Sequence, residues 1–320
     1  MKHSTHRFLA YLGIVALVFS SGTRLLAQGY YATVAGGWNN TATGSYSTVG
    51  GGSNNLASGY ASVITGGAEN IGSGNYTTVS GGFNTGGGVA SAVTGGAFNS
   101  ASGNYSIVAG GGGNVASGFV SFAAGCGANT NNQSGAFVWG DSGCTGLNAT
   151  APNQFMARAS GGVIFYSNTG LTSGVQLAAG GGSWSSVSDR NVKEHFAPVD
   201  NQQLLLRVLA LPVTTWNYKT QDASIRHIGP MAQDFFTAFK VGEDDHHITE
   251  IDEGGVALAA VQGLNQKLEE QLRQKDAQLS AQQKQIDALQ QQMNQMMQRV
   301  AAVEKTSPTN ARGSVIAALR

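Results

Sequence analysis

The sequence predicts a mainly β N-terminal half, a roll or solenoid of about seven 15-residue repeats, followed by a small α+β domain and a C-terminal coiled coil. Three observations predict this architecture: a recurring glycine pair, a change from nearly uncharged to charged sequence around Ser188, and a long heptad pattern. The 320 residues divide into a leader (1–27), head repeats (28–131), a β-rich transition (132–187), an α+β domain (188–257), a coiled coil (258–305) and a tail (306–320).

The first 27 residues have the pattern of a secretory signal peptide. Lys2 and Arg7 belong to a basic start, Phe8 to Phe19 form a short apolar core, and small residues follow up to Ala27. The apolar run is too short for an ordinary membrane span, which leaves an uncleaved N-terminal anchor as the alternative. We therefore expect bacterial export to the medium or the cell surface. No later segment is apolar enough to span a bilayer as a helix, so no integral membrane domain is predicted.

A repeat of about 15 residues fills the N-terminal half. Its members share a glycine pair, a β-branched or small residue two positions earlier, and usually an asparagine soon afterwards. The pairs begin at Gly36, Gly51, Gly66, Gly81, Gly95, Gly110 and Gly125. β-branched residues fit a pleated, half-buried surface, and stacked coils bury an apolar face that one coil cannot. A disordered linker would not hold this phase over seven repeats.

The repeats, beginning with Val-Ala-Gly-Gly-Trp-Asn-Asn-Thr-Ala-Thr-Gly-Ser-Tyr-Ser, resemble the head repeats of trimeric autotransporter adhesins over residues 29–131. The resemblance implies a trimeric left-handed β-roll with an adhesive surface, and hence a homotrimer with a carbohydrate or extracellular matrix ligand. The net charge of zero gives no reason to expect a nucleic-acid partner. The Gly110–Gly113 run is not followed by Lys-Ser or Lys-Thr, so it is not a phosphate loop and no cofactor is predicted.

Cys126 and Cys144 are the only two cysteines. An oxidising compartment permits a disulfide between them, and two buried or unpaired thiols are the alternative. Between Gln28 and Val187 the charged residues are Glu69, Asp141 and Arg158. A carbohydrate-active enzyme would need paired carboxylates, and Glu69 and Asp141 lie far apart in the sequence.

The last long segment predicts a coiled coil, because apolar residues occupy most a and d positions of a sustained heptad pattern. The a positions are Leu258, Asn265, Leu272, Leu279, Ile286, Met293 and Val300, and the d positions are Val261, Leu268, Lys275, Gln282, Leu289, Met296 and Val303. One amphipathic helix packed on its own domain is the alternative. This a/d seam does not fix the number of helices in the coiled coil. We choose a trimer because the resemblance of the head repeats implies one.

The segment after residue 187 resembles the self-cleaving intramolecular chaperone domain of phage endosialidases and tail spikes. The matching residues are Ser188-Asp189 with Lys193, then Trp216-Asn217-Tyr218, then Ile228-Gly229-Pro230-Met231-Ala232-Gln233, and the coiled coil. The resemblance implies a catalytic serine and lysine at Ser188 and Lys193. It places the cut at a bond adjoining Ser188, beside Val187 or Asp189.

The chemistry requires a base, because a serine hydroxyl is a weak nucleophile until its proton is removed. A lysine serves if burial or a neighbouring cation favours its neutral form, which packing in a trimer would provide. His195 is a rival base, and Ser188 as a simple turn or helix cap is the structural alternative. The run Glu243 to His247 is interpreted as a solvated acidic loop, so no metal site is predicted.

We therefore predict an exported, fibre-like or adhesin-like trimer that processes itself once. A phage-type tail fibre is one alternative, but the signal-peptide pattern of residues 1–27 argues against it. A carbohydrate-binding or carbohydrate-active fibre matured by the same chaperone is the other. Interlocked parallel strands from three chains would fold slowly, and a C-terminal coiled coil would bring the chains into register first.

Overall fold

The structure is a computed structural model that describes residues 25–306. The remainder of the predicted leader and residues 307–320 of the predicted tail lie outside the described residues, while Leu25–Ala27 form a strand. The chain divides into two compact units, and the boundary falls between Val187 and Ser188. Within the described residues, no helix is long and apolar enough to cross a membrane.

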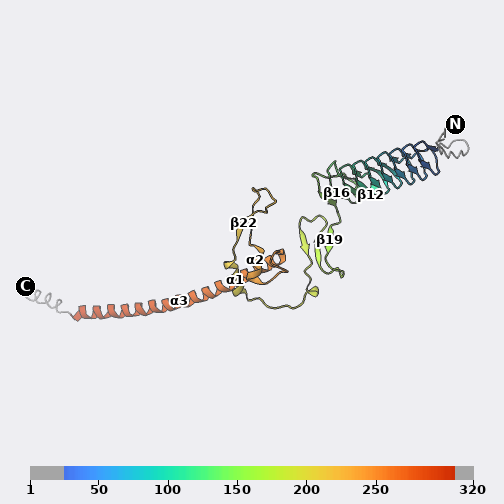
Figure 1. Ribbon diagram of the computed structural model, residues 1–320. Helices are drawn as coiled ribbons and strands as arrows, with labels where there is room; N and C mark the ends of the chain where they lie inside the picture. Colours follow the sequence, from blue (N-terminus) through green and yellow to red (C-terminus); the bar gives the residue numbers. More distant parts are fainter. Residues whose placement is uncertain (1–24, 307–320) are drawn as a thin grey trace, which may run out of the picture. The chain divides into compact units, whose positions relative to one another are not determined.

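The first unit is a parallel β-solenoid (Figure 1), which is the predicted fold for this half. Odd-numbered strands pair with odd and even with even, apart from one contact of β11 with β12 at Ala97 and Gly112, so each coil supplies one strand to each of two parallel ladders. The strands are β1 (Leu25–Ala27), β2 (Thr33–Val34), β3 (Asn40–Ala42), β4 (Thr48–Val49), β5 (Leu56–Ala57), β6 (Val63–Ile64), β7 (Ile71–Gly72), β8 (Thr78–Val79), β9 (Phe83–Gly86), β10 (Ala92–Val93), β11 (Ala97–Ala101), β12 (Ile107–Gly112), β13 (Val115–Ala116), β14 (Phe122–Cys126), β15 (Ala128–Asn129), β16 (Phe137–Gly140), β17 (Leu147–Asn148) and β18 (Phe155–Arg158).

The strand ladders of the solenoid close within one chain. The repeat returns each strand beside its predecessor, so that Val49 pairs with Val34 on one side and Ile64 on the other. Each coil therefore satisfies its backbone hydrogen bonds on neighbouring coils of the same polypeptide.

The solenoid is longer than the seven predicted repeats, because its eighteen strands make nine coils. Phe137 and Phe155 continue the even ladder in register, and both lie in the predicted transition region. The 15-residue spacing is lost there, because Phe137 and Phe155 are 18 positions apart in the sequence. The sequence period therefore ends before the structural period does.

The interior of the solenoid consists of two facing rows of small apolar residues. One row contains Val49, Ile64 and their equivalents, and the other contains mostly alanine, as at Ala42 and Ala57; all four are fully buried. The close stacking of successive coils explains the constant phase of the glycines along the repeat. A Cβ built on Gly52, which has φ 87°, would overlap the carbonyl oxygen of Gly67 in the next coil.

An asparagine ladder runs inside one corner, through Asn40, Asn55, Asn70, Asn84, Asn99 and Asn114. The Nδ2 atom of Asn55 donates to the carbonyl oxygens of Gly51 and Gly67, both at 2.9 Å. The Oδ1 atom of Asn55 accepts from the backbone N–H of Asn70 at 2.9 Å. Buried polar groups need such partners, so the asparagine of each repeat fastens one turn to the next.

An antiparallel sheet follows the solenoid, made of β19 (Val163–Tyr166), β20 (Gly174–Leu177) and β21 (Trp184–Ser186). Its last hydrogen bond lies one residue beyond β21, where the N–H of Val187 donates to the carbonyl of Gly174 at 3.1 Å. The chain is thus held to this sheet up to the last residue of the first unit.

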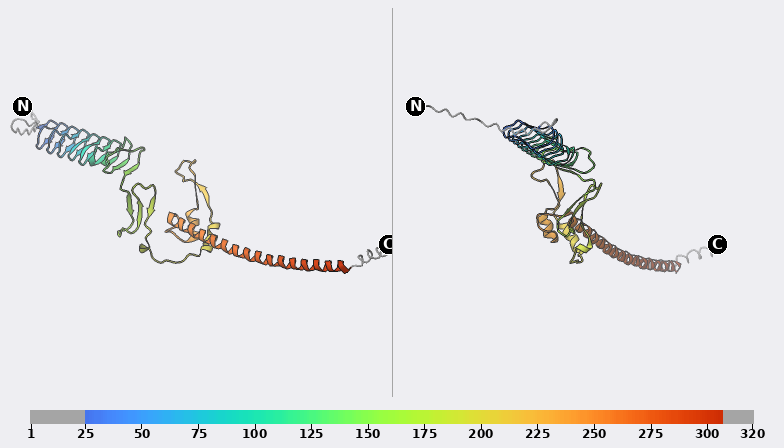
Figure 2. Two further views of the ribbon diagram at one scale, coloured as in Figure 1. Left: turned by 180° about the vertical axis from the view of Figure 1, so that it is seen from behind. Right: turned by 90° about the vertical axis from the view of Figure 1, so that its right-hand side faces the viewer.

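The second unit is small and mixed. It contains the 3-10 helix η1 (Arg190–Val192), α1 (Asn201–Ala210), α2 (Ala232–Phe239), α3 (Glu250–Thr306) and a hairpin of β22 (Thr214–Trp216) and β23 (His227–Gly229). Its buried side chains are few, among them Leu205, Phe235 and Ala260. The views in Figure 2 show α3 as one long helix, and its 57 residues span roughly 85 Å.

Helix α1 packs on the first part of α3 through a notch at Gly263. This glycine is buried, and a Cβ on it would overlap the carbonyl of Asn201 at the start of α1. Ala260, which is 8% exposed, lies on the same side of α3. Two small residues spaced by three positions therefore admit α1 on one face of the long helix.

Candidate self-cleavage site and assembly seam

Ser188 and Lys193 meet at the first residues of the second unit. The Nζ atom of Lys193 donates a hydrogen bond to the Oγ atom of Ser188 over 2.6 Å. This separation lies within the reach expected of a nucleophile and its base. When the amine is neutral, the hydrogen bond reverses and the hydroxyl donates to nitrogen, which is the arrangement that starts proton removal.

A single turn brings the two side chains together. The Oδ1 atom of Asp189 accepts from the backbone N–H of Asn191 at 2.9 Å and from its Nδ2 atom at 3.0 Å. This cap starts η1, and the N–H of Lys193 then donates to the carbonyl of Arg190 at 3.2 Å. The turn shortens the path between Ser188 and Lys193, so a spacing of five residues places hydroxyl and amine side by side.

The pair lies in solvent in the single chain. Ser188, Lys193 and every residue between them are exposed. Burial is one of the influences that favour a neutral amine, and the isolated chain does not supply it here. The geometry is therefore present before assembly, whereas the desolvation that would activate it is not.

His195, the rival base, points elsewhere. Its backbone has φ 56°, and its Nε2 atom lies 3.4 Å from an Oε1 atom of Glu194. Within residues 25–306 no hydrogen bond joins its ring to Ser188. The geometry thus favours Lys193 as the partner of the serine.

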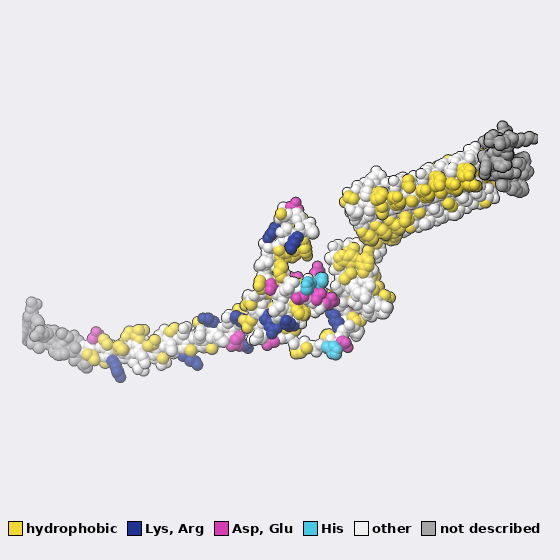
Figure 3. Space-filling view, viewed as in Figure 1, with side chains coloured by type: hydrophobic (Ala, Val, Ile, Leu, Met, Phe, Trp, Pro, Cys, Tyr) yellow, Lys and Arg dark blue, Asp and Glu magenta, His cyan; other side chains and the backbone are white. Residues whose placement is uncertain are grey.

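The heptad seam of α3 is uncovered along its whole described length. Its apolar a and d side chains, from Leu258 to Val303, are between 47% and 69% exposed. In the same heptad, Ala260 and Gly263 occupy positions c and f, on the side away from the seam. The α1 packing therefore uses the back of α3 and leaves the a/d face exposed. Hydrophobic side chains along the helix are visible in Figure 3.

Polar positions interrupt this seam, as expected from the sequence. The Nδ2 atom of Asn265, at position a, donates to the Oε1 atom of Glu269 at 2.9 Å within the same helix. A polar a position selects register at some cost in stability.

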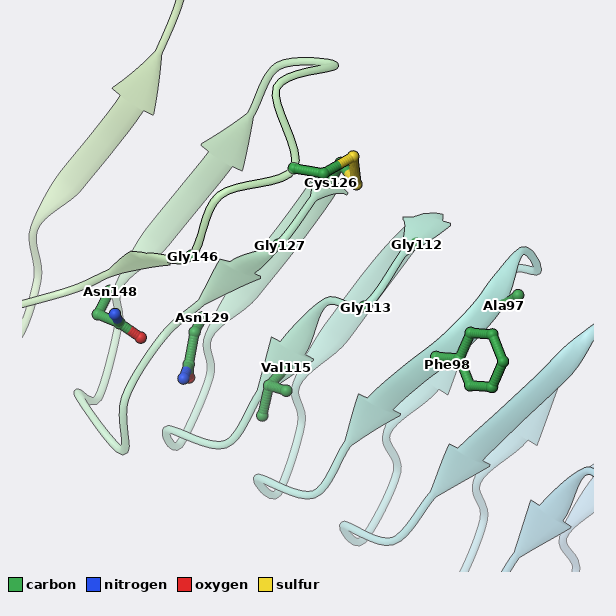
Figure 4. Close-up of a pocket in the computed structure, with 11 residues that line it drawn as sticks. Ala97, Phe98, Gly112, Gly113, Val115, Cys126, Gly127, Asn129, Gly146 and Asn148 are labelled. Carbon is green, nitrogen blue, oxygen red and sulfur yellow. A yellow bond between two sulfur atoms is a disulfide. The ribbon is translucent and has the colours of Figure 1, made fainter.

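Cys126 and Cys144, which are 18 positions apart in the sequence, form a disulfide that ties β14 to the loop before β17. The bridge borders a hollow of about 510 Å³ on the solenoid surface (Figure 4), which Phe98, Val115, Asn129 and Asn148 also line. No charged side chain lines this hollow.

Asp141 and Arg158 form an ion pair near the end of the solenoid, with Nε and Oδ1 2.7 Å apart. Asp141 also accepts from the backbone N–H groups of Ser160 and Gly143. Its hydrogen bonds, first to Ser160 and then to Arg158, hold the pKa of the Asp141 carboxyl well below its usual range. Glu69 lies several coils away, so a single chain does not bring the two acids of the carbohydrate-enzyme alternative together.

The histidines of the acidic loop bond to their neighbours. His247 Nδ1 lies 2.9 Å from an oxygen of Asp244, and His246 Nδ1 lies 2.6 Å from Asp245. Among the residues that the structure describes, no group of three or more His, Cys, Asp or Glu side chains is placed to hold a metal ion.

Sequence reasoning missed two residues of this region. Asn191 shares the cap with Asp189, and Gly263 forms the notch for α1. A signal existed for the second, because glycine in an otherwise good helix usually has a packing or functional reason. Asn191 carries no comparable signal, since asparagine in a turn is common.

A comparison with family models bears on this segment. Residues 188–241 match the model described as the chaperone of endosialidase. The match begins at Ser188, the first residue of the second unit, and includes Lys193, both strands of the hairpin and α2. It does not extend over the solenoid, so the resemblance of residues 29–131 to autotransporter heads is not confirmed. A search of curated proteins gave no match.

The chaperone of endosialidase family implies trimerisation. Together with a β-solenoid and a long C-terminal helix, the match indicates a tail-fibre-like trimeric protein with an intramolecular chaperone.

Proposed function

We propose that this protein is an exported trimeric surface fibre, adhesin-like in its solenoid, whose C-terminal chaperone drives assembly and then cuts itself off. The observation that carries the proposal is the Lys193–Ser188 hydrogen bond of 2.6 Å, placed where one compact unit ends and the next begins. A cut there would release the solenoid and its small sheet from the whole of the matched segment and α3.

The proposed cut proceeds through an ester between Ser188 and Val187. Lys193 Nζ takes the proton of Ser188 Oγ, and the oxygen attacks the carbonyl carbon of Val187. The carbon–nitrogen bond breaks, the proton on Lys193 passes to the leaving amine, and water hydrolyses the resulting ester. Attack on Val187 closes a five-membered ring, whereas attack of Ser188 on its own carbonyl would close a four-membered one. We therefore place the cut at the Val187–Ser188 bond.

Two restraints support this location. On one side, Val187 is tied to the small sheet through Gly174. On the other, Asp189 caps the turn that holds Lys193. The scissile bond then lies between two anchored segments, which helps to hold the attacking and attacked atoms in a reactive geometry.

Assembly would supply the missing activation. Three α3 helices packing through their a/d seams would place three copies of the exposed 188–193 turn in one assembly. Burial there would favour the neutral lysine, so that folding precedes cutting. Release of the chaperone removes the route by which the chain reached its fold, and the fibre then resists unfolding kinetically.

The test is expression of residues 28–320 as wild type, Ser188→Ala and Lys193→Met, with His195→Ala as the matched control. We expect wild type and His195→Ala to give one fragment ending at Val187 and one beginning at Ser188, as read by intact mass. Both dyad variants should stay whole. An uncut wild-type trimer, or a cut in Ser188→Ala, would reject the dyad.

Export is tested separately by fusing residues 1–27 to a reporter enzyme and measuring the reporter outside the cytoplasm. A reporter retained inside would favour the phage-type tail fibre, which needs no leader. Binding of a carbohydrate or matrix ligand by the released solenoid would establish the adhesive role.

A further inference from the structure

One corner of the solenoid carries large apolar side chains on seven successive coils. We call this row the tyrosine ridge; it consists of Tyr30, Tyr31, Tyr46, Tyr60, Tyr76, Val89, Tyr105, Phe119 and Val120. Each of them lies in the turn that joins an odd strand to the next even strand. Their exposed fractions run from 37% to 68%, so the core of the single chain does not account for them.

Several ridge residues have a positive φ, a backbone conformation in which large side chains are unusual. Tyr46, Tyr76 and Tyr105 have φ between 58° and 60°, the left-handed region that glycine and asparagine adopt at lower cost. At the corresponding turn near the end of the solenoid, the residues are Gly135 and Asn153. In five of the seven coils this strained position holds an aromatic or branched residue, and in the other two it holds Ala61 and Ala90. The five are Tyr31, Tyr46, Tyr76, Tyr105 and Val120. Strain of this kind commonly marks functional positions.

The rings form contacts along the ridge. The ring centroids of Tyr46 and Tyr60, and those of Tyr60 and Tyr76, are 5.4 Å apart. A second stretch joins Tyr105 to Phe119 at 5.6 Å. The contacts restrict the rings, so a partner that covers them has less side-chain freedom to remove.

The size and charge of the ridge fit a protein interface. Nine aromatic or branched side chains, each about half exposed, present on the order of 800 Å². One partner contributes about that area to a standard interface. No member is charged, and tyrosine and phenylalanine are enriched in interface cores while charged residues are depleted.

The two flat faces of the solenoid are less suitable. The outward row of the even strands begins with Thr33, Thr48, Val63 and Thr78. The outward row of the odd strands mixes apolar and polar residues, in the order Leu26, Thr41, Leu56, Ile71, Thr85 and Ser100. Apolar residues recur on these rows only in part, as in the Phe122–Phe137–Phe155 stack at one end. The ridge alone presents an apolar side chain on each coil from Tyr30 to Phe119.

We infer that the tyrosine ridge is the seam along which copies of the solenoid contact each other, so that a second and a third copy of this chain cover it. The inference rests on the proposed trimer and extends it, because it assigns the face of the solenoid that meets the axis. Three ridges around one axis would bury their rings against each other, as the a/d side chains of α3 are proposed to do.

The test places single cysteines on Ser188→Ala protein, which keeps the chaperone attached. Tyr60→Cys and Phe119→Cys probe the ridge, because neither position has a positive φ. Thr41→Cys and Thr48→Cys are matched controls on the two flat faces. The native cysteines are bonded to each other and do not compete. Each variant is treated with a short bis-maleimide, and its mass is measured by light scattering before treatment.

The inference predicts covalent dimers and trimers for both ridge variants and mostly monomers for both controls. Ridge cysteines should also react with a bulky maleimide many times more slowly in the folded protein than in denaturant. Cross-links from a threonine position alone, or a ridge that labels freely in a trimer, would overturn it. A mass of one chain by light scattering would reject the proposed trimer itself. That result differs from a trimer whose ridge is not cross-linked, which would reject only the ridge as the seam.

A soluble neutral glycan is included as a competitor. Protection of the ridge that appears only with glycan present would mean a ligand platform rather than a seam, and would also overturn the inference.

Discussion

The solenoid and the second unit differ in how they bury their apolar side chains. Inside the solenoid, each coil covers the apolar row of its neighbour, and the asparagine ladder pairs its own buried amides. In the second unit, α3 projects most of its apolar seam into solvent, and the body buries few side chains. The core of the first unit is therefore nearly complete in a single chain, whereas the second unit leaves its apolar seam exposed for the partners that we propose. A protein that must assemble before it matures would benefit from this division.

The largest expected effect in the solenoid comes from breaking the asparagine ladder. Asn70→Leu removes the bonds of Asn70 Nδ2 to the carbonyls of Gly66 and Gly82 and leaves the N–H of Asn84 without its acceptor. We expect a loss of about 3 kcal/mol or more in unfolding free energy, because several buried groups become unsatisfied together. Denaturant unfolding of the released solenoid measures it. A loss within experimental error would show that the ladder does not hold the coils together.

The disulfide is expected to matter next, and only for the first unit. Replacing Cys126 and Cys144 by serine frees a loop of 18 residues, and chain entropy predicts a loss of about 3 kcal/mol. Unfolding with and without reductant, followed by solenoid signal and by α3 helicity, separates the two units. An equal loss in both would contradict their independence.

A smaller effect is expected where α1 meets α3. Gly263→Val should clash with Asn201 and cost about 1–3 kcal/mol. Gly254→Ala is the matched control, because nothing lies within 4 Å of a Cβ there, and it should stabilise the helix by about 1 kcal/mol. Thermal unfolding of the second unit, read by helicity, distinguishes the two. Equal behaviour of both variants would mean that the notch does not exist in solution.

The smallest effect concerns acid. Since Ser160 and Arg158 lower the pKa of Asp141 in the folded state, its stabilisation is complete above the unfolded value of about 4 and declines as the pH falls below it. The midpoint for unfolding of the solenoid end should drop between about pH 4 and pH 2. The variant Asp141→Asn should show a weaker dependence of this unfolding midpoint on pH. A steeper pH dependence in the variant would contradict the assignment.

Much of this division could be predicted from the sequence, because it depends on periodicity. Glycine pairs with a β-branched residue in phase predicted the coils, and the heptads predicted α3, which starts at Glu250, eight residues before the predicted Leu258. The end of the solenoid could not be placed, because the coil between Phe137 and Phe155 contains extra residues and lacks the glycine pair. Pairing in register depends on neighbouring coils, which a single window of sequence does not contain.

The site followed from the sequence only in part. The order Ser188, Asp189 and Lys193 suggested the pair, and the turn capped by Asp189 explains how five residues of separation become 2.6 Å between Oγ and Nζ. The desolvation that the sequence led us to expect from packing in a trimer is not present in the single chain, where Ser188 and Lys193 are both exposed. Gly263 carried a sequence signal as a glycine within a helical pattern, but its partner Asn201 in α1 could not be predicted, because the contact is tertiary.

The central claim is that the reactive pair is silent in one chain and active in three. Leu268→Asp with Leu279→Asp places charges at a d and an a position of the seam, and Gln291→Asp with Gln298→Asp, both at f positions, is the control on the outer face of α3. One measurement on each, light scattering joined to intact mass, gives assembly and cutting together. We predict an uncut single chain for the seam variant and a cut trimer for the control. A single chain of the seam variant that cuts beside Ser188 at the wild-type rate would contradict the account.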